Sequence, residues 1–321
     1  MKYVLGPLIG KGSDGEVYDL IDKDDKERTI KFIQPTDYGF ENYIEAYILL
    51  NLKHQNLMFS YEIDIEENGL TKIVQDKATC DLGKLIYGPK RNKINNSLRI
   101  KYIKQLISGI SFLHSYNIVH GDIKPSNLLV VKDDLYLNDF SMSRLVKLEF
   151  MELLLPLENK RKRSNINERT NRKLYTFIYR APECNMNKFS LKSDIYALGC
   201  TIYEIYYNQP YYSVSGDNRV YHIHAQNYYD HKNAEINELI RSMVINHPPE
   251  NRINIETVCG FFDMEIPKKK VLNLCLSPDH GSKVFSNKIE HLVGRIRMNS
   301  GEKKRERKIF ESGLKIFTVE S

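Results

Sequence analysis

The sequence predicts an α+β fold of two unequal lobes followed by a basic tail. Short runs rich in Val, Ile, Leu, Tyr and Phe, separated by turn residues, dominate residues 1–77 and indicate a small antiparallel sheet. Helical periodicity prevails from residue 78 to residue 265 and indicates a larger helical lobe. A chain of 321 residues can bury one large core or two moderate ones, so both lobes fit within it.

The first lobe is expected to hold five strands and one helix. The expected strands are residues 3–9, 15–21, 28–33, 57–65 and 70–76. The last two are joined through Asn68-Gly69, a step that suits a tight hairpin turn. Between the third and fourth strands, apolar residues recur on one face of a helix, with Glu45 on another part of the turn. We expect the connection to the second lobe near residues 76–78.

The second lobe is expected to begin with a helix whose N-cap is Ser97. Its apolar face comprises Leu98, Tyr102, Ile103, Leu106, Ile107, Ile110 and Leu113. A second helix is predicted over residues 190–207, with Ile195, Leu198, Ile202 and Ile205 facing inward.

Composition favours an intracellular protein without a membrane anchor. The longest apolar runs, such as 195–205, are interrupted by polar residues and are shorter than the roughly 18 to 20 residues that a membrane span needs. The N-terminus lacks the apolar stretch of a secretory signal, so we expect a cytoplasmic or nuclear location. The five cysteines are scattered without a C-x-x-C pair, which is typical of buried thiols in a reducing compartment.

The positive charge of the chain belongs to its tail. From Pro267 onward, 13 Lys and Arg residues face 6 Asp and Glu residues, a net charge of +7. Because the whole chain carries +6, residues 1–266 carry −1. We therefore treat residues 266–321 as a basic C-terminal tail that could dock on the second lobe or bind a polyanion.

The motif His120-Gly121-Asp122-Ile123-Lys124-Pro125-Ser126-Asn127, followed by Asn138-Asp139-Phe140-Ser141, predicts a phosphoryl-transfer site. Such transfer mainly requires groups that position the reactants and neutralise charge. Asp122 would accept or orient the incoming hydroxyl, and Lys124 would contact the γ-phosphate. Asn127 and Asp139 would hold Mg²⁺ through oxygen ligands. The two segments resemble the catalytic loop and the metal loop of the eukaryotic-type protein kinases, usually written HRDLKxxN and DFG.

This resemblance implies a bilobal protein kinase fold over residues 1–265, with an N-lobe of 1–77 and a C-lobe of 78–265. It also implies a Mg²⁺- and ATP-dependent enzyme that phosphorylates Ser and Thr hydroxyls of protein substrates. Lys124 and Thr176 favour Ser/Thr over Tyr as the acceptor.

Further residues match the nucleotide-binding parts of that family. The residues that would line the ATP site are Ile9, Gly10, Gly12, Gly15, Val17, Lys31, Asp76 and Ala78, with Gln75 as the gatekeeper. Gly10-x-Gly12-x-x-Gly15-x-Val17 lies between two expected strands, where its backbone amides could cover phosphates. Lys31 stands where the family has its VAIK lysine, and Glu45 is the carboxylate that would steady it. A plain turn and solvated surface charges are the alternatives.

Three departures from the family pattern bear on regulation. Gly121 replaces the arginine that in this family binds a phosphate on the activation segment. Asn171 falls where the activating phosphothreonine often stands, counted back from Ala181-Pro182-Glu183. We therefore expect activity without phosphorylation at that site, while Ser164, Thr170 and Thr176 remain phosphorylatable and leave other regulation open. Ser141 replaces the glycine of DFG and restricts φ, so a flip of this loop should be less accessible.

Two other matches predict structural roles. Glu183 is expected to pair with Arg252, and Asp194 is expected to hold the backbone of the catalytic loop. The phrase Tyr179-Arg180-Ala181-Pro182-Glu183 is closest in style to the cyclin-dependent and mitogen-activated kinases. However, residues 40–45 lack the PSTAIRE sequence, which makes cyclin dependence doubtful.

Two competing readings remain. A pseudokinase scaffold is suggested by Gly121, Ser141 and Thr29, although the expected catalytic positions are all present. A nucleic-acid-binding role, or a docking or polyanion-binding role, is suggested by the basic insert Lys160–Arg163 and the basic tail. A solvated loop without a dedicated role is an equal alternative for the insert.

Overall fold

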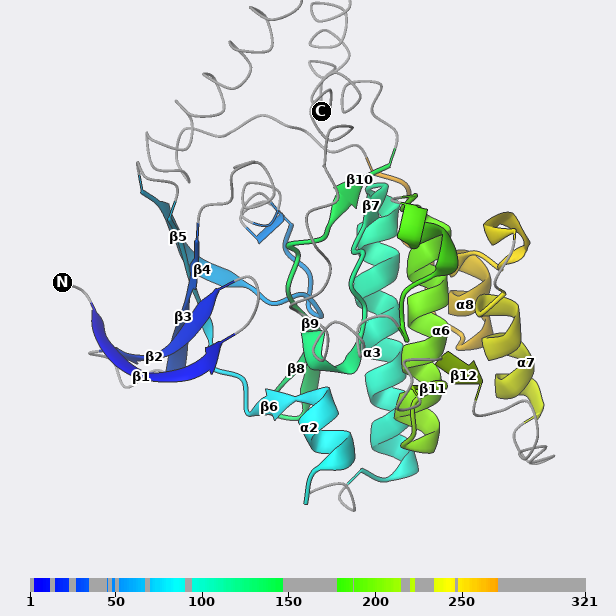
Figure 1. Cartoon of the computed structure of the whole chain (residues 1–321), viewed down its shortest axis with the longest axis horizontal. Coiled ribbons are helices and arrows are strands. Elements are labelled where there is room, and N and C mark those ends of the chain that lie inside the picture. Colours follow the sequence, from blue (N-terminus) through cyan, green and yellow to red (C-terminus); the bar gives the residue numbers. More distant parts are fainter. Residues whose placement is uncertain are drawn as a thin grey trace, which may run out of the picture.

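The computed structural model places a sheet-rich lobe beside a helix-rich lobe (Figure 1). It describes residues 3–11, 15–22, 27–34, 45, 48–49, 52–66, 70–89, 94–146, 178–186, 188–214, 220–222, 234–245 and 248–270. The expected α+β fold with a small antiparallel sheet is confirmed, as is the order of the lobes along the chain.

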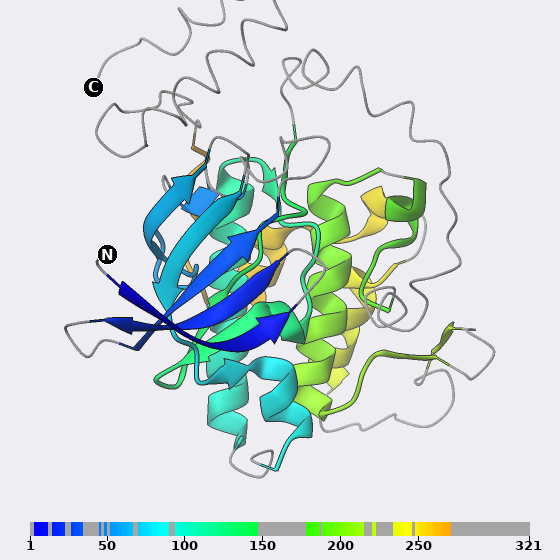
Figure 2. The ribbon, with the colours of Figure 1, turned by 60° about the vertical axis from the view of Figure 1, so that its left-hand side comes forward.

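The small lobe is built on an antiparallel sheet of five strands in the order β1-β2-β3-β5-β4 (Figure 2). The strands are β1 (Tyr3–Lys11), β2 (Glu16–Asp22), β3 (Glu27–Ile33), β4 (Ser60–Ile65) and β5 (Thr71–Asp76). β4 begins three residues later than the sequence predicts. The reason is that Leu57 and Met58 pair instead with Leu137 of the large lobe, with Met58 N–H donating to its carbonyl at 2.9 Å.

The helix of the small lobe is described at Glu45, Ile48 and Leu49, each buried to about 2% exposure. The expectation that Glu45 lies away from the apolar face was wrong, because Glu45 is as buried as Ile48 and Leu49. Ile48 and Leu49 belong to the same apolar core as Leu52 and Ile73. The Asn68-Gly69 turn lies outside the described residues. On either side of it, the N–H of Glu66 donates to the carbonyl of Leu70 at 2.9 Å.

The large lobe packs around two long helices, α3 (Asn96–Ser115) and α6 (Leu191–Tyr207). Smaller helices flank them: α2 (Leu82–Tyr87), α7 (Ala234–Met243) and α8 (Ile255–Phe261). The inward faces predicted for α3 and α6 are buried, apart from the half-buried Leu98. The predicted N-cap of α3 was wrong, because Asn95 accepts the N–H of Leu98 at 2.9 Å and starts the helix earlier than Ser97 would.

Three small sheets complete the described part of the large lobe. One sheet contains β6 (Cys80–Asp81), β8 (Leu128–Val131) and β9 (Asp134–Leu137). β7 (Ile118–Val119) pairs with β10 (Arg144–Leu145), and β11 (Tyr212–Val214) pairs with β12 (Val220–His222). The segments 120–127 and 138–143 therefore lie beside each other, because β7 precedes one, β10 follows the other, and β8 and β9 are antiparallel neighbours. Single 3₁₀ turns cover Pro125–Asn127, Pro182–Met186 and Pro249–Asn251.

The lobes are joined by close packing as well as by the chain connection. Gly109 of α3 lies against the segment before β4, where an added Cβ would stand 3.2 Å from the carbonyl oxygen of Asn56. The side chain of Asn56 donates to the carbonyl of Leu135 at 3.1 Å. Among the described helices, none combines the length and the apolar character needed to cross a bilayer.

A glycine sets the distance between α6 and the end of α7, and its replacement tests this packing. A Cβ on Gly199 would stand 2.7 Å from Cγ2 of Val244 and 2.8 Å from Cβ of Met243. We expect Gly199→Ala to lower the free energy of unfolding by about 1–3 kcal/mol through overpacking. Urea unfolding measures the change.

The matched control is Gly260→Ala in α8, where a Cβ would meet nothing within 4 Å. Because alanine favours a helix over glycine, this variant should be up to about 1 kcal/mol more stable. If both variants gained stability equally, α6 and α7 would not depend on a bare glycine contact.

Candidate active site

One wall of the candidate nucleotide site is a row of residues across the small sheet. The register pairs Gly10 with Val17 and Val17 with Lys31. Directly paired residues project their side chains from the same face of a sheet, so Val17 and Lys31 share a face with Gly10, where an added Cβ would stand 3.8 Å from Cβ of Val17. Ile9, one residue earlier, is 47% exposed and available for contact with a ligand.

Gly15 has a backbone that only glycine adopts readily. Its φ is +152°, and a Cβ there would stand 2.0 Å from the carbonyl oxygen of Phe32. The backbone just before β2 can thus lie close to β3. Gly12, the middle glycine of the predicted loop, lies outside the described residues.

Lys31 joins the sheet to the helix and to the metal loop. Its Nζ lies 2.8 Å from Oε1 of Glu45 and 3.5 Å from Oδ1 of Asp139. Glu45 is 2% exposed, so this ion pair is shielded from water. Burial alone would raise the pKa of Asp139, but the nearby ammonium of Lys31, together with a hydrogen bond from Ser141, holds it below its ordinary value.

The catalytic loop brings Asp122, Lys124 and Asn127 together. Lys124 Nζ donates to Oδ2 of Asp122 at 2.6 Å. Nδ2 of Asn127 donates to the same carboxylate oxygen at 2.9 Å and to the carbonyl of Asp122 at 2.8 Å. The 3₁₀ turn at Pro125–Asn127 places the amide below the carboxylate and fixes its orientation.

The site has a pair of oxygen atoms that suits Mg²⁺. Oδ1 of Asp139 is buried and finds no hydrogen-bond partner among the described residues. The amide nitrogen of Asn127 is used by Asp122, which leaves its oxygen as the coordinating atom. Two protein oxygens fit Mg²⁺ better than a metal that demands a full protein cage, because Mg²⁺ keeps several waters and binds substrate phosphates. No cluster of three or more acidic, His or Cys ligands occurs within the described part of the chain.

His120 supports both loops from beneath. Its Nδ1 accepts the N–H of Asp122 at 3.3 Å, and its Nε2 lies 3.2 Å from the carbonyl of Asn138. These partners require the neutral ring with the proton on Nε2. Complete burial lowers the pKa of His120, in agreement with the neutral form. Its ring also packs against Phe140, which is fully buried.

Asp194 of α6 holds the start of the catalytic loop, as the sequence predicted. Its carboxylate accepts the N–H of His120 at 2.7 Å and of Gly121 at 2.9 Å. It also accepts Nε2–H of His114 at 3.0 Å. The carboxylate is 1% exposed, so three donors compensate its burial.

The backbone requirement at Gly121 was not foreseen from the sequence. Its φ is +83°, and a Cβ would stand 2.6 Å from the carbonyl oxygen of Met142. Gly121 therefore removes steric strain as well as a guanidinium. In the metal loop the left-handed residue is Asp139, with φ +66°, and Ser141 is absent from the described residues with positive φ. Serine at that position is compatible with this arrangement.

The connection between the lobes is bonded to each of them in turn. Lys77 N–H donates to the carbonyl of Glu27 at 3.1 Å, and its Nζ pairs with Asp19 at 2.7 Å. Thr79 N–H donates to the carbonyl of Val130 at 2.8 Å in the large lobe. Ala78 stands between them and is half-buried.

Two residues at the end of β5 differ in how their side chains are used. The carboxylate of Asp76 accepts a hydrogen bond from Tyr61 at 2.9 Å, and Asp76 pairs with Arg28 in the sheet. Gln75 is 6% exposed, and its Nε2 has no hydrogen-bond partner among the described residues.

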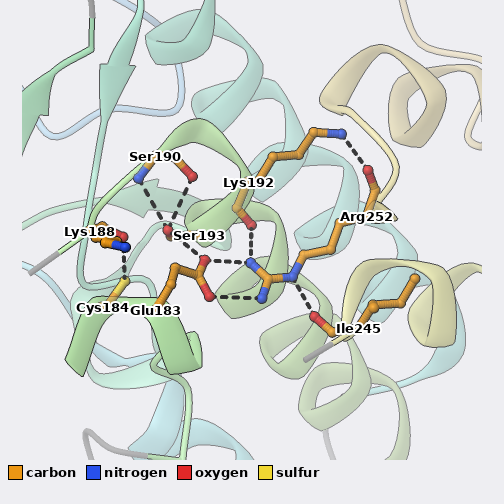
Figure 3. Close-up of polar contacts among 8 residues, drawn as sticks. All are labelled: Glu183, Cys184, Lys188, Ser190, Lys192, Ser193, Ile245 and Arg252. Carbon is orange, nitrogen blue, oxygen red and sulfur yellow. Dashed lines mark hydrogen bonds and ion pairs between the residues drawn. The ribbon is translucent and has the colours of Figure 1, made fainter. Parts of the chain in front are cut away.

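Glu183 and Arg252 form the predicted ion pair, shown in Figure 3. The guanidinium binds both carboxylate oxygens, at 2.6 and 2.9 Å, and Ser193 adds a hydrogen bond at 2.9 Å. Arg252 also donates to the carbonyls of Lys192 and Ile245. Burial alone would raise the pKa of Glu183, but the guanidinium holds it below its usual value.

Glu204 is a supporting residue that the sequence analysis did not single out. It is 1% exposed and accepts hydrogen bonds from Tyr179 at 2.5 Å and Tyr87 at 2.7 Å. Burial raises its pKa above the ordinary value. It ties α6 to α2 and to the segment before Ala181. A carboxylate within the apolar pattern of 191–207 was the available signal.

Several predicted positions lie outside the described residues: Lys160–Arg163, Ser164, Thr170, Asn171, Thr176 and the tail beyond Lys270.

Comparisons with known proteins agree with this arrangement. A family model described as the protein kinase domain matches residues 3–277. A probable cell division protein kinase of Encephalitozoon cuniculi is 32% identical over 216 residues, which are 65% of this chain and 73% of that protein.

Two further relatives are matched over a smaller share of their length. The mitogen-activated protein kinase mpk-1 of Caenorhabditis elegans is 29% identical over 220 residues, 65% of this chain and 46% of that protein. The human tyrosine-protein kinase FRK is 27% identical over 225 residues, 68% of this chain and 42% of that protein. The chain thus spans less than half the length of these two.

The Glu183–Arg252 pair yields a test of the large lobe. Arg252→Leu would leave a carboxylate buried without its cation, so we expect a loss of about 3–5 kcal/mol in the free energy of unfolding. The double variant Glu183→Leu with Arg252→Leu should recover a large part of that loss, because no uncompensated charge remains. Urea unfolding measures both.

The matched control is Arg241→Leu, since Arg241 pairs with Glu238 at 3.6 Å on the surface. A change below about 1 kcal/mol is expected there. Equal losses at both arginines would show that charge burial is not the cause.

Proposed function

Because this chain belongs to the eukaryotic-type protein kinase family, related to the cyclin-dependent and mitogen-activated branch, we propose that it is a protein serine/threonine kinase that uses ATP and Mg²⁺. One observation carries the proposal. Lys31 of β3 lies 3.5 Å from Asp139 of the metal loop, and the N–H of Asn138 in the metal loop donates to the carbonyl of Asn127 in the catalytic loop at 3.0 Å. Such convergence of three separate segments suits charge neutralisation around a terminal phosphate.

In the proposed reaction, a substrate hydroxyl approaches Asp122 and gives up its proton to that carboxylate. The hydroxyl oxygen forms a bond to the γ-phosphorus, the bond to the bridging oxygen of the β-phosphate breaks, and ADP leaves. Lys124, 2.6 Å from Asp122, balances charge on the carboxylate and on the γ-phosphate. Lys31, steadied by Glu45, would bind the α- and β-phosphates. Mg²⁺, held by Asn127 and Asp139, supplies further neutralisation of the phosphate oxygens when bound.

The nucleotide is proposed to lie between the lobes. Its adenine would contact Ile9, Val17 and the backbone of Asp76 to Ala78, with Gln75 as the gatekeeper behind it. Backbone amides of the turn between Gly10 and Gly15 would cover the phosphates. The backbone of Gly15, with φ +152° and no room for a Cβ beside the carbonyl oxygen of Phe32, supports this placement.

The choice of acceptor rests on the catalytic loop. Lys124, two residues after Asp122, occupies the position that in the family favours Ser and Thr hydroxyls. The similarity to a mitogen-activated kinase and to a probable cell division kinase supports the same choice, although the tyrosine kinase FRK also matches.

We also propose that activity does not require phosphorylation of the activation segment at the usual site. Gly121 has no guanidinium to bind a phosphate, and its N–H is held at 2.9 Å by Asp194 of the same chain. Asn171, at the usual position, cannot be phosphorylated.

The remaining expectations stay proposals. The kinase domain is assigned to residues 1–265, with Lys160–Arg163 and the tail as surfaces for a docking partner or polyanion. Cyclin dependence stays doubtful, since residues 40–45 lack the PSTAIRE sequence. Scattered cysteines without a C-x-x-C pair support a cytoplasmic or nuclear location.

The first test is transfer of radiolabelled phosphate from ATP to matched Ser, Thr and Tyr peptides. We expect labelling of the Ser and Thr peptides. Asp122→Asn should lower kcat by about 10²- to 10⁴-fold and leave the affinity for ATP nearly unchanged, because it removes a contact with the reacting hydroxyl.

Asp64→Asn is the matched control, since Asp64 is exposed on β4 and pairs with Lys72 at 3.9 Å. It should behave like the wild type. Loss of ATP binding in parallel with rate would contradict the role given to Asp122. A wild-type protein that transfers no phosphate would instead be a pseudokinase scaffold.

A second test addresses activation. Treatment of the purified protein with a broad-specificity phosphatase, followed by its removal, should leave kcat/KM within about twofold of the untreated enzyme. The triple variant Ser164→Ala, Thr170→Ala, Thr176→Ala removes the hydroxyl groups near that site. Its comparison with the phosphatase-treated protein distinguishes phosphates near the site from phosphates elsewhere in the chain. Abolished turnover after phosphatase treatment would show that a phosphate is needed.

A further inference from the structure

A groove lies where the small lobe meets α3. It has a volume of about 310 Å³ and is lined by Leu52, Lys53, His54, Gln55, Leu57 and Phe59. Phe59 remains 38% exposed, with the ammonium of Lys53 5.2 Å from its ring centre. An apolar ring at the mouth of a concave surface is a feature that favours a bound apolar side chain.

The last described residues of the chain approach this groove. After α8 the backbone reaches the end of α3, where the N–H of Lys270 donates to the carbonyl of Ser115 at 2.8 Å. The ammonium of Lys270 lies 5.0 Å from the ring centre of Phe112 and 5.3 Å from that of Tyr116. The end of the described chain is therefore fixed at these two rings.

One stacked pair of rings lies between Lys270 and the groove. The ring of His54, a groove residue, stacks on Phe112 with centres 4.6 Å apart and planes 24° apart. Burial lowers the pKa of His54, and the positive charge of Lys270 lowers it further, which agrees with their proximity. Phe112 thus touches both the end of the described chain and one wall of the groove.

The residues that follow have a pattern suited to such a surface. In Val271-Leu272-Asn273-Leu274-Cys275-Leu276, leucine alternates with Asn and Cys, so an extended segment would carry three leucines on one face. The six residues carry no charge. From Lys270, the four residues to Leu274 span at most about 14 Å, which is enough to pass from Phe112 into the groove.

We propose that residues 271–276, hereafter the docking segment, bind in this groove in extended form with their leucines inward. The occupant is this chain's own segment, because its starting point is fixed beside the groove and its apolar period matches an extended strand. Leu52, one wall of the groove, follows the helix that carries Glu45. The docked segment would consequently brace that helix from behind.

The test is disulfide formation within the full-length chain. In a Cys275→Ser background, Phe59→Cys is combined with Leu274→Cys and mildly oxidised, and the linked peptides are identified by mass spectrometry. We expect an intramolecular disulfide at least about tenfold faster than for Ile21→Cys with Leu274→Cys. Ile21 is 57% exposed on β2 and is not a groove residue.

Two further variants make the result independent of one site. Gln55→Cys replaces Phe59→Cys as a second groove position if the latter does not fold, as judged by thermal unfolding of the reduced protein. Asn273→Cys replaces Leu274→Cys and should react more slowly with either groove cysteine, because it belongs to the opposite face. Equal rates at the groove and at residue 21 would overturn the proposal. Disulfides that join two chains would do so as well, since they would make a second copy the occupant.

Discussion

The buried carboxylate of Asp194 is the constraint on which the rest of the site depends. It fixes two successive backbone amides, those of His120 and Gly121, at the point where the catalytic loop leaves β7. Because α6 is the most buried described helix of the large lobe, these hydrogen bonds restrict the movement of the catalytic loop relative to the core. The ring of His120 is in turn hydrogen-bonded to the carbonyl of Asn138. The two loops that carry Asp122 and Asp139 are therefore both held, directly or through His120, by Asp194.

Around these loops, the site is organised by alternating charge. Lys31 lies between the carboxylates of Glu45 and Asp139, and Lys124 lies against Asp122. Each cation reduces the repulsion between acidic groups that would otherwise be costly at such depth. The arrangement leaves oxygen atoms of Asp139 and Asn127 available for a cation. A bound triphosphate with Mg²⁺ would continue this alternation of negative and positive charges.

The sequence predicted the strands of the small sheet and the two long helices because these rest on local patterns. Runs rich in Val, Ile, Leu, Tyr and Phe between turn residues mark β1 to β5, and the motifs of the candidate site fall in short segments of the sequence. The sequence could not predict the start of β4, because Leu57 and Met58 pair with Leu137, about 80 residues away. The left-handed backbone of Gly121 depends on the closeness of Met142, and the tyrosines around Glu204 come from distant elements. Long-range contacts of this kind leave no periodic trace.

The bonds at the interlobe connection determine where motion between the lobes can occur. Lys77 is attached to the sheet through Glu27 and Asp19, whereas Thr79 is attached to the strand that follows the catalytic loop. Rotation of one lobe against the other would therefore change the torsion angles of Ala78, while the pairing of Leu57 and Met58 with Leu137 forms a second attachment between the lobes. Ala78 also belongs to the backbone that is proposed to contact adenine. A base bound there would restrict how far the two lobes can rotate against each other.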